Sequence, residues 1–250
     1  MKRTAHNFFM SVRQYFLLAV VALTFVPLAQ GATAAKRAIL VGGGADADFI
    51  MLRDASARGD MGDTGRLAAR LVDYPIQSYV DYYRLYPRLV STPEGEIRNY
   101  LNRYDGTAIA DRLRNDWLLI LGRARDWRLF DEQYPLFVLN DDVQVKCYAL
   151  SSRIAKGEHV VKAARELLVQ PKSYGEACVD LIQRLYQDRQ FSEDDIWRQI
   201  RLAAEYGASS AARRIAYLIN VSERQVMPAI DRPSLIVERG AAGSQATREL

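Results

Sequence analysis

Two clusters of acidic residues are the first candidates for chemistry in this chain of 250 residues. Asp141-Asp142 and Glu193-Asp194-Asp195 place carboxylates side by side, as general acid–base catalysis would require. Each cluster, however, stands directly before an apolar helical pattern. Acids at a helix N-terminus are stabilised by the helix dipole and by unpaired N–H groups. This capping role accounts for both clusters, and we predict no catalytic carboxylate in them.

The other reactive residue types form no complete site either. The histidines are His6 and His159, and the sequence contains no G-x-S-x-G and no C-x-x-C, the spacings typical of a nucleophile or a zinc site. The run from Ile39 to Ala47 matches the G-x-G-x-x-A pattern of a dinucleotide-binding loop. That loop works only inside a βαβ unit, and the sequence after it is helical. We therefore predict no catalytic, cofactor-binding or metal-binding residue.

Residues 1–34 have the features of a secretory signal peptide. Basic residues open the stretch, an apolar run extends over 15–28, and small residues around Gly31 and Ala34 offer cleavage positions. An uncleaved membrane anchor is the alternative, but the run is short of the ~20 residues that a spanning helix needs. The sequence thus predicts an exported, periplasmic protein that contacts the membrane only during export.

Removal of this segment changes the charge of the chain. The full sequence carries a net charge of +4, and Lys2, Arg3 and Arg13 leave with no acid, so the mature chain carries +1. Most later arginines are interleaved with Asp and Glu, and Arg213-Arg214 is the one notable basic pair. Nucleic-acid binding requires a clustered basic patch, so we predict no nucleic-acid partner.

Export would allow the two cysteines to form a disulfide, because disulfides persist outside the cytoplasm. In helical register, Cys147 lies on the apolar side of its segment with Leu150 and Ile154, and Cys178 lies with Leu181 and Ile182. We predict a Cys147–Cys178 disulfide. Two buried free thiols are the alternative.

Helical patterns recur along the chain, whereas β-branched alternation is rare. An apolar stripe at i, i+3, i+4 and i+7 lies between Pro75 and Pro87. Further helices are expected at about 142–155, 158–169, 174–188 and 193–206. Three of them start with a capping-box pattern, at Asp141–Gln144, Ser173–Glu176 and Ser192–Asp195. Paired helices with short polar connections, at roughly 30–35 residues per pair, indicate an all-α fold without a sheet. Specifically, we predict an α-solenoid, or superhelix, of antiparallel helix pairs similar to tetratricopeptide arrays.

We divide the chain into four parts. Residues 1–34 are the signal peptide, 35–45 a flexible leading segment, 46–230 the α-superhelical domain, and 231–250 a connection with the start of a further helix. The last helical pattern begins near Ala246 and stops at Leu250. Because a solenoid needs a terminal cap, we expect this chain to be the N-terminal part of a longer protein.

Four features along the chain form a larger pattern. They are Tyr74 to Tyr82, which reads Tyr-Pro-aliphatic-x-x-Tyr-aliphatic-acidic-Tyr, then Arg125-Asp126-Trp127, the pair Cys147 and Cys178, and Gly175-Glu176-Ala177 ahead of the second cysteine. Their order and spacing resemble the early superhelical region of the soluble lytic murein transglycosylases. The resemblance covers roughly residues 46–220.

The resemblance implies a periplasmic α-superhelix that carries a separate lysozyme-like catalytic domain. In that family one glutamate cleaves the MurNAc–GlcNAc bond of peptidoglycan to a 1,6-anhydromuramic product, so glycan strands are the implied partner. The family's E-S, G-L-M-Q and A-Y-N motifs do not occur here, and the nearest strings are Ser192-Glu193 and Ala216-Tyr217-Leu218. No residue inherits the catalytic role, and we expect this chain to be the scaffold without the active site.

A second interpretation stays open from the sequence. The chain would be an independent periplasmic helical-repeat adaptor that binds a protein or peptide in its concave face. A third, a glycosidase within residues 36–250, would need a placed carboxyl group, which the sequence lacks.

Overall fold

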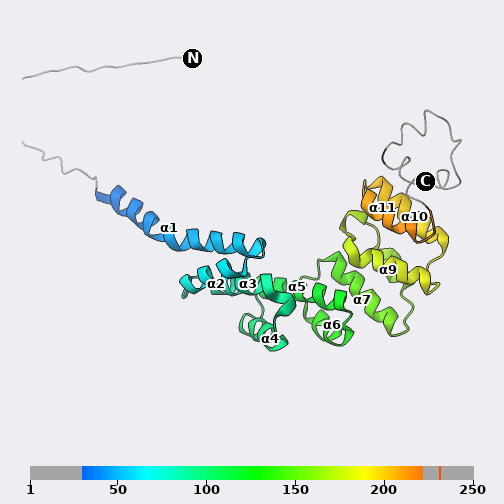
Figure 1. Cartoon of the computed structure of the whole chain (residues 1–250), viewed down its shortest axis with the longest axis horizontal. Helices are drawn as coiled ribbons and strands as arrows, with labels where there is room; N and C mark the ends of the chain where they lie inside the picture. Colours follow the sequence, from blue (N-terminus) through cyan, green and yellow to red (C-terminus); the bar gives the residue numbers. More distant parts are fainter. Residues whose placement is uncertain (1–29, 222–230, 232–250) are drawn as a thin grey trace, which may run out of the picture. The chain divides into compact units, whose positions relative to one another are not determined.

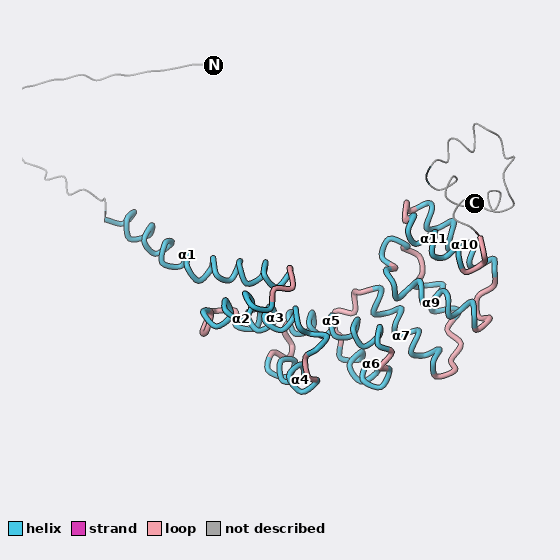
Figure 2. Tube along the Cα trace, in the orientation of Figure 1, coloured by secondary structure: helices cyan, strands magenta, loops and turns pink. Residues whose placement is uncertain are grey.

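The computed structural model describes residues 30–221 and residue 231, with side chains from residue 44 on (Figure 1). Every regular element in this part of the chain is a helix, which confirms the predicted all-α fold without a sheet (Figure 2). Most of the predicted signal peptide, residues 1–29, lies outside the described residues. So does nearly all of 231–250. Among the described residues, no helix is both long and apolar enough to cross a membrane.

The described residues contain eleven α-helices and three short 3-10 helices. In order these are α1 (Gln30–Ala57), α2 (Met61–Arg70), α3 (Gln77–Leu85), η1 (Tyr86–Ser91), α4 (Glu94–Arg103), α5 (Ala108–Ala124), α6 (Trp127–Gln133), η2 (Tyr134–Leu136), α7 (Val143–Ala155), α8 (Val161–Leu167), η3 (Pro171–Ser173), α9 (Gly175–Gln187), α10 (Glu193–Glu205) and α11 (Ser209–Tyr217).

The odd-numbered helices from α3 onward stack on one another in sequence. Helix α3 packs on α5, α5 on α7, α7 on α9, and α9 on α11. Helices α4 and α6 pack on α5, α8 packs on α7, and α10 packs mainly on α11. From α3 to α11, each helix thus packs on helices close to it in the sequence, which is the packing of an α-solenoid.

The start of α1 corrects the sequence analysis. We placed a flexible leading segment at 35–45 and the first helix from residue 46, whereas α1 already covers 35–45. Three consecutive glycines, 42–44, suggested a break. Glycine costs only about 1 kcal/mol per residue in a helix, and the helix-forming Ala, Leu and Lys residues before it allow the helix to run through. By internal contacts, the described residues up to Gly44 and those from Ala45 on belong to separate units.

Helix starts follow local capping chemistry where a suitable side chain stands at the N-cap. The Ser192 hydroxyl accepts the N–H of Asp195, whose carboxylate accepts the N–H of Ser192, so the predicted capping box of α10 is present. Helix α7 is capped by Asp142, one residue later than predicted. The box predicted from Ser173 to Glu176 is wrong, because Ser173 belongs to η3 and α9 begins without a side-chain cap.

A buried ion pair fixes the connection after η2. Asp111 and Arg114 on α5 are only 6% and 8% exposed. The Asp111 carboxylate accepts the backbone N–H groups of Val138 and Leu139 at 3.0 and 2.7 Å, and Arg114 donates to the Leu136 carbonyl at 2.9 Å. Each charged group therefore contacts backbone groups as well as its partner at 3.4 Å.

Candidate functional site

A disulfide joins Cys147 on α7 to Cys178 on α9. The Cα atoms are 5.1 Å apart, within the usual range for a bridge, and both cysteines are fully buried. Neither cysteine of the chain is free. The bridge thus fixes the spacing of two neighbouring odd-numbered helices at the centre of the array.

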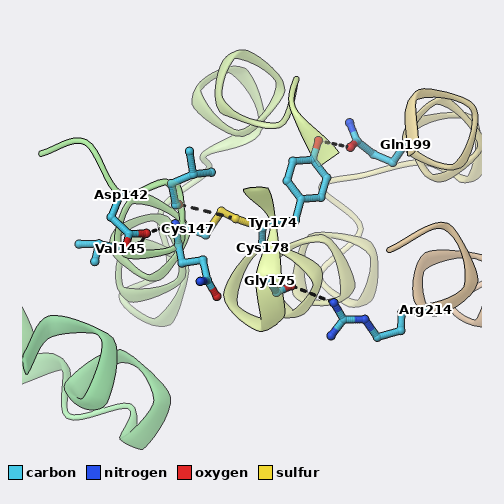
Figure 3. The surroundings of a disulfide bond; sticks show 10 residues. Asp142, Val145, Cys147, Tyr174, Gly175, Cys178, Gln199 and Arg214 are labelled. Carbon is cyan, nitrogen blue, oxygen red and sulfur yellow. Dashed lines mark hydrogen bonds between the residues drawn. A yellow bond between two sulfur atoms is a disulfide. The ribbon is translucent and has the colours of Figure 1, made fainter. Parts of the chain in front are cut away.

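Hydrogen bonds tie the start of α9 to the next two helices (Figure 3). The hydroxyl of Tyr174, which is fully buried, donates to the Gln199 side chain on α10 at 2.7 Å. Arg214 on α11 donates to the Gly175 carbonyl at 3.0 Å. Gly175 has φ of +51°, and an added Cβ would lie 2.0 Å from the Gln144 side chain. A side chain here would therefore disturb the contact between α9 and α7.

A cleft of about 280 Å³, which we call the central cleft, is lined in part by the two helices that this disulfide joins. It is formed by the end of α5, the start of α6, the middle of α7, and α9 from its first turn onward. Guanidinium groups, carboxylates and two aromatic rings line it, from Gly122, Arg123, Arg125, Trp127, Tyr148, Ser151, Glu176, Asp180 and Arg184. Because α7 and α9 carry two of its walls, the Cys147–Cys178 bridge holds the cleft in shape.

The motif Arg125-Asp126-Trp127 places two of the lining side chains. Arg125 ends α5 in the left-handed conformation, with φ of 57°, and its N–H bonds to the carbonyls of Leu121 and Gly122. Asp126 caps α6 by accepting the N–H of Leu129 at 3.1 Å. The aspartate of the motif therefore has a structural role, while the arginine and the tryptophan face the cleft.

The floor of the cleft depends on a close approach of α5 and α7. Gly122 on α5 faces the ring of Tyr148 on α7, and an added Cβ would lie 2.3 Å from the ring carbon Cγ. Only glycine allows this contact. Partial burial raises the pKa of the Tyr148 hydroxyl, so it stays a neutral donor in the physiological range.

The charges in the cleft are only partly paired. Arg123 contacts Glu176 at 3.2 Å. The guanidinium groups of Arg125 and Arg184 form no ion pair or hydrogen bond within the described part of the chain. Desolvation, with repulsion from Glu176, raises the pKa of Asp180 despite its neighbouring arginines. Two cations and one carboxylate therefore remain available to a ligand.

Two further clefts adjoin the central one. A cleft of about 480 Å³, lined by residues of 56–59 and 86–90 and by α5, shares Arg123 with it. A cleft of about 700 Å³ between α9 and α11 shares Asp180 with it. These clefts follow the odd-numbered helices from η1 and α5 to α11. Because each outer cleft shares a lining residue with the central cleft, we treat the three together and call them the groove.

The acidic clusters of the sequence act as helix caps. Asp142 accepts the N–H groups of Gln144 and Val145 at the start of α7. Asp195 lies in the capping box of α10 and also binds the Arg165 guanidinium at 3.0 Å. Within the described ranges, no group of three or more His, Cys, Asp and Glu side chains could hold a metal ion.

Several cleft residues were not singled out from the sequence. Tyr148, Asp180 and Arg184 lie on ordinary helical stretches, and Gly122 is a single glycine in a helix. One signal was present: Glu176, Asp180 and Arg184 recur every four residues and so lie on one polar face of α9. That pattern by itself also describes an ordinary solvated helix.

Comparisons with known proteins show the same fold in two lytic transglycosylase structures. An inactive mutant of the lytic transglycosylase Slt from Pseudomonas aeruginosa is 22% identical, with a TM-score of 0.51 over 81% of this chain. The 70-kDa soluble lytic transglycosylase in complex with bulgecin A is 17% identical, with a TM-score of 0.54 over 82% of this chain. No protein-family model matches the sequence, and no curated protein matches it. The chain spans 34% of the length of each structure, and it therefore has the fold of a helical part of these lytic transglycosylases.

Proposed function

We propose that this chain is the helical scaffold of a lytic transglycosylase that acts on peptidoglycan. The observation that carries the proposal is the fold likeness to two such enzymes over four fifths of the chain. The order of the Tyr-Pro run, the Arg-Asp-Trp junction and the two cysteines supports it. In this proposal the protein works in the periplasm, after export by the N-terminal signal peptide.

The scaffold holds peptidoglycan, and the chemistry belongs to a catalytic domain outside this sequence. The groove supports this role, because three adjoining clefts that extend from η1 and α5 to α11 suit a linear polymer. Aromatic rings at Tyr86, Trp127 and Tyr217 offer flat apolar faces on which sugar rings can stack. Bond cleavage to 1,6-anhydromuramic products is assigned to the whole enzyme.

Co-sedimentation with isolated peptidoglycan sacculi tests this function. We expect the purified chain to pellet with the sacculi and to release no soluble muropeptides, because it holds the polymer without cutting it. A chain that stays in the supernatant would overturn the proposed scaffold role. Release of anhydromuropeptides by this chain alone would overturn the assignment of catalysis to another domain.

One observation favours the alternative function of a periplasmic adaptor. Leu136, Val138 and Leu139 are 50%, 85% and 52% exposed, and the buried Asp111–Arg114 pair holds their backbone in place. A fixed loop with exposed apolar side chains suits a protein partner. Recovery of a stoichiometric protein complex from the periplasm, without binding to sacculi, would support the adaptor.

A further inference from the structure

We propose that the central cleft binds the peptide stems of peptidoglycan and discriminates by charge between stem-bearing and stem-free glycan. This inference rests on the proposed function and names the part of the polymer that this cleft recognises. The sugar backbone of N-acetylated, peptide-substituted glycan carries no charge. The stems carry free carboxylates and, in many bacteria, a free amine.

The first argument is the balance of charge in the cleft. Arg123 is paired with Glu176, which leaves Arg125 and Arg184 facing the single carboxylate of Asp180. A neutral sugar would leave both guanidinium groups without a partner. A peptide carboxylate can bind a guanidinium through two parallel hydrogen bonds, and Asp180 is placed to accept an ammonium group of the same peptide.

The second argument is the backbone at Arg125. This residue has φ of 57°, a left-handed conformation that helices usually assign to glycine or asparagine at this position. An arginine is strained here, and its backbone N–H bonds are ones that glycine could make equally well. Its side chain adds a guanidinium group to the lining of the cleft, which Trp127 also lines.

The third argument is that the walls are fixed before any ligand binds. The Cys147–Cys178 bridge sets the distance between α7 and α9, and the Gly122–Tyr148 contact sets the distance between α5 and α7. A rigid site loses less conformational entropy on binding. The helices that carry the unpaired charges are therefore held at a defined separation, which favours selection of a zwitterionic peptide.

Tryptophan fluorescence gives a direct readout of this cleft. Of the chain's three tryptophans, Trp117 and Trp197 are only 3% and 7% exposed, whereas Trp127 lines the cleft. The full chain is titrated with three probes. They are stem-bearing glycan strands, the same strands with the stems removed by amidase and the freed lactyl carboxylates converted to neutral amides, and the free stem peptide. Sacculus binding is measured in parallel.

We expect the free peptide and the stem-bearing strands to shift the Trp127 emission, with affinity at least about tenfold higher than for stem-free strands. Arg125→Gln and Arg184→Gln should each remove about tenfold in affinity for the peptide. The control Arg198→Gln makes the same change at an exposed arginine of α10 outside the cleft, and it should leave binding unchanged. Circular dichroism should show the same helix content for all variants, because neither cleft guanidinium is paired within the described chain.

A second variant tests the other half of the site. Asp180→Asn should abolish the preference for a stem with a free amine over the same stem with an acetylated amine, while binding to the carboxylate continues. Equal affinity of the unmodified chain for stem-bearing and stem-free strands would overturn the inference and leave the scaffold function standing. Binding to neither strands nor sacculi would overturn both.

Discussion

Loss of the Cys147–Cys178 disulfide is expected to lower the free energy of unfolding by about 3.7 kcal/mol. The bridge joins residues 31 positions apart. Closing a loop of this length removes about 12 cal/mol/K of entropy from the unfolded chain, which is about 3.7 kcal/mol at 25 °C. Small domains are stable by only about 5–15 kcal/mol in total. The bridge therefore supplies a large share of the stability of the helical array.

Urea unfolding followed by circular dichroism measures this effect. The oxidised protein is compared with the same protein in reductant, and both with the double variant Cys147→Ala/Cys178→Ala. Reduction should also raise the dependence of stability on urea, because the unfolded chain becomes more expanded. The double variant is the control, since reductant should leave its unfolding unchanged.

Two results would refute this reasoning. A difference below about 1 kcal/mol between oxidised and reduced protein would mean that the bridge does not constrain the unfolded chain as the loop argument requires. Alkylation of two thiols in denatured protein that has not been reduced would mean that Cys147 and Cys178 are not joined.

Three further predictions concern buried charge, pH and close packing. Asp111→Ala should lower the unfolding free energy by about 3–5 kcal/mol in urea titrations, because it leaves the Arg114 charge buried without its partner; a loss below 1 kcal/mol would contradict this. Desolvation acts to raise the pKa of Asp195, but hydrogen bonds from Arg165 and Ser192 outweigh it and lower this pKa. The ionised Asp195 carboxylate therefore stabilises the fold fully at pH values above its pKa in the unfolded chain, about 3.9. This stabilisation disappears as the pH falls through the lower pKa of the folded protein. The stability gap between the unmodified chain and Asp195→Asn should close over that range, and a gap that widens with acid would contradict the assignment. Gly122→Ala should lower the free energy of unfolding by about 1–3 kcal/mol through overpacking against the Tyr148 ring. The control Gly65→Ala lies in helix α2, where an added Cβ would meet nothing within 4 Å, and it should raise the free energy of unfolding by up to about 1 kcal/mol. Equal effects of the two substitutions would contradict the packing argument.

Elements fixed by local chemistry could be predicted from the sequence. The predicted helix at 193–206 is observed as α10, Glu193–Glu205, because Ser192 and Asp195 complete a capping box within four residues. The helix expected at 174–188 is observed as α9, Gly175–Gln187, but the cap predicted for it is wrong. Pro171 begins a 3-10 turn that includes Ser173, so the residue expected to cap the helix is part of another element.

The central cleft could be predicted only in part. Arg125 and Trp127 belong to one short motif, so the sequence identified that junction. Tyr148, Asp180 and Arg184 join them only because α5, α7 and α9 stack. Their separation in the sequence hides this proximity, and the Gly122 contact that sets the stacking distance leaves no pattern in a single sequence.

Hydroxyl-radical footprinting of the full chain on peptidoglycan sacculi tests the central claim that the groove is the surface that holds the polymer. Tyr86 lines the groove and is 42% exposed, whereas Tyr206, at the end of α10, is 43% exposed and lines none of the three clefts. The two tyrosines should therefore be oxidised similarly in the free protein. With sacculi, the account predicts strong protection of Tyr86, Trp127 and Tyr217 and none of Tyr206. Equal protection of Tyr86 and Tyr206, or no protection of any groove residue, would contradict it.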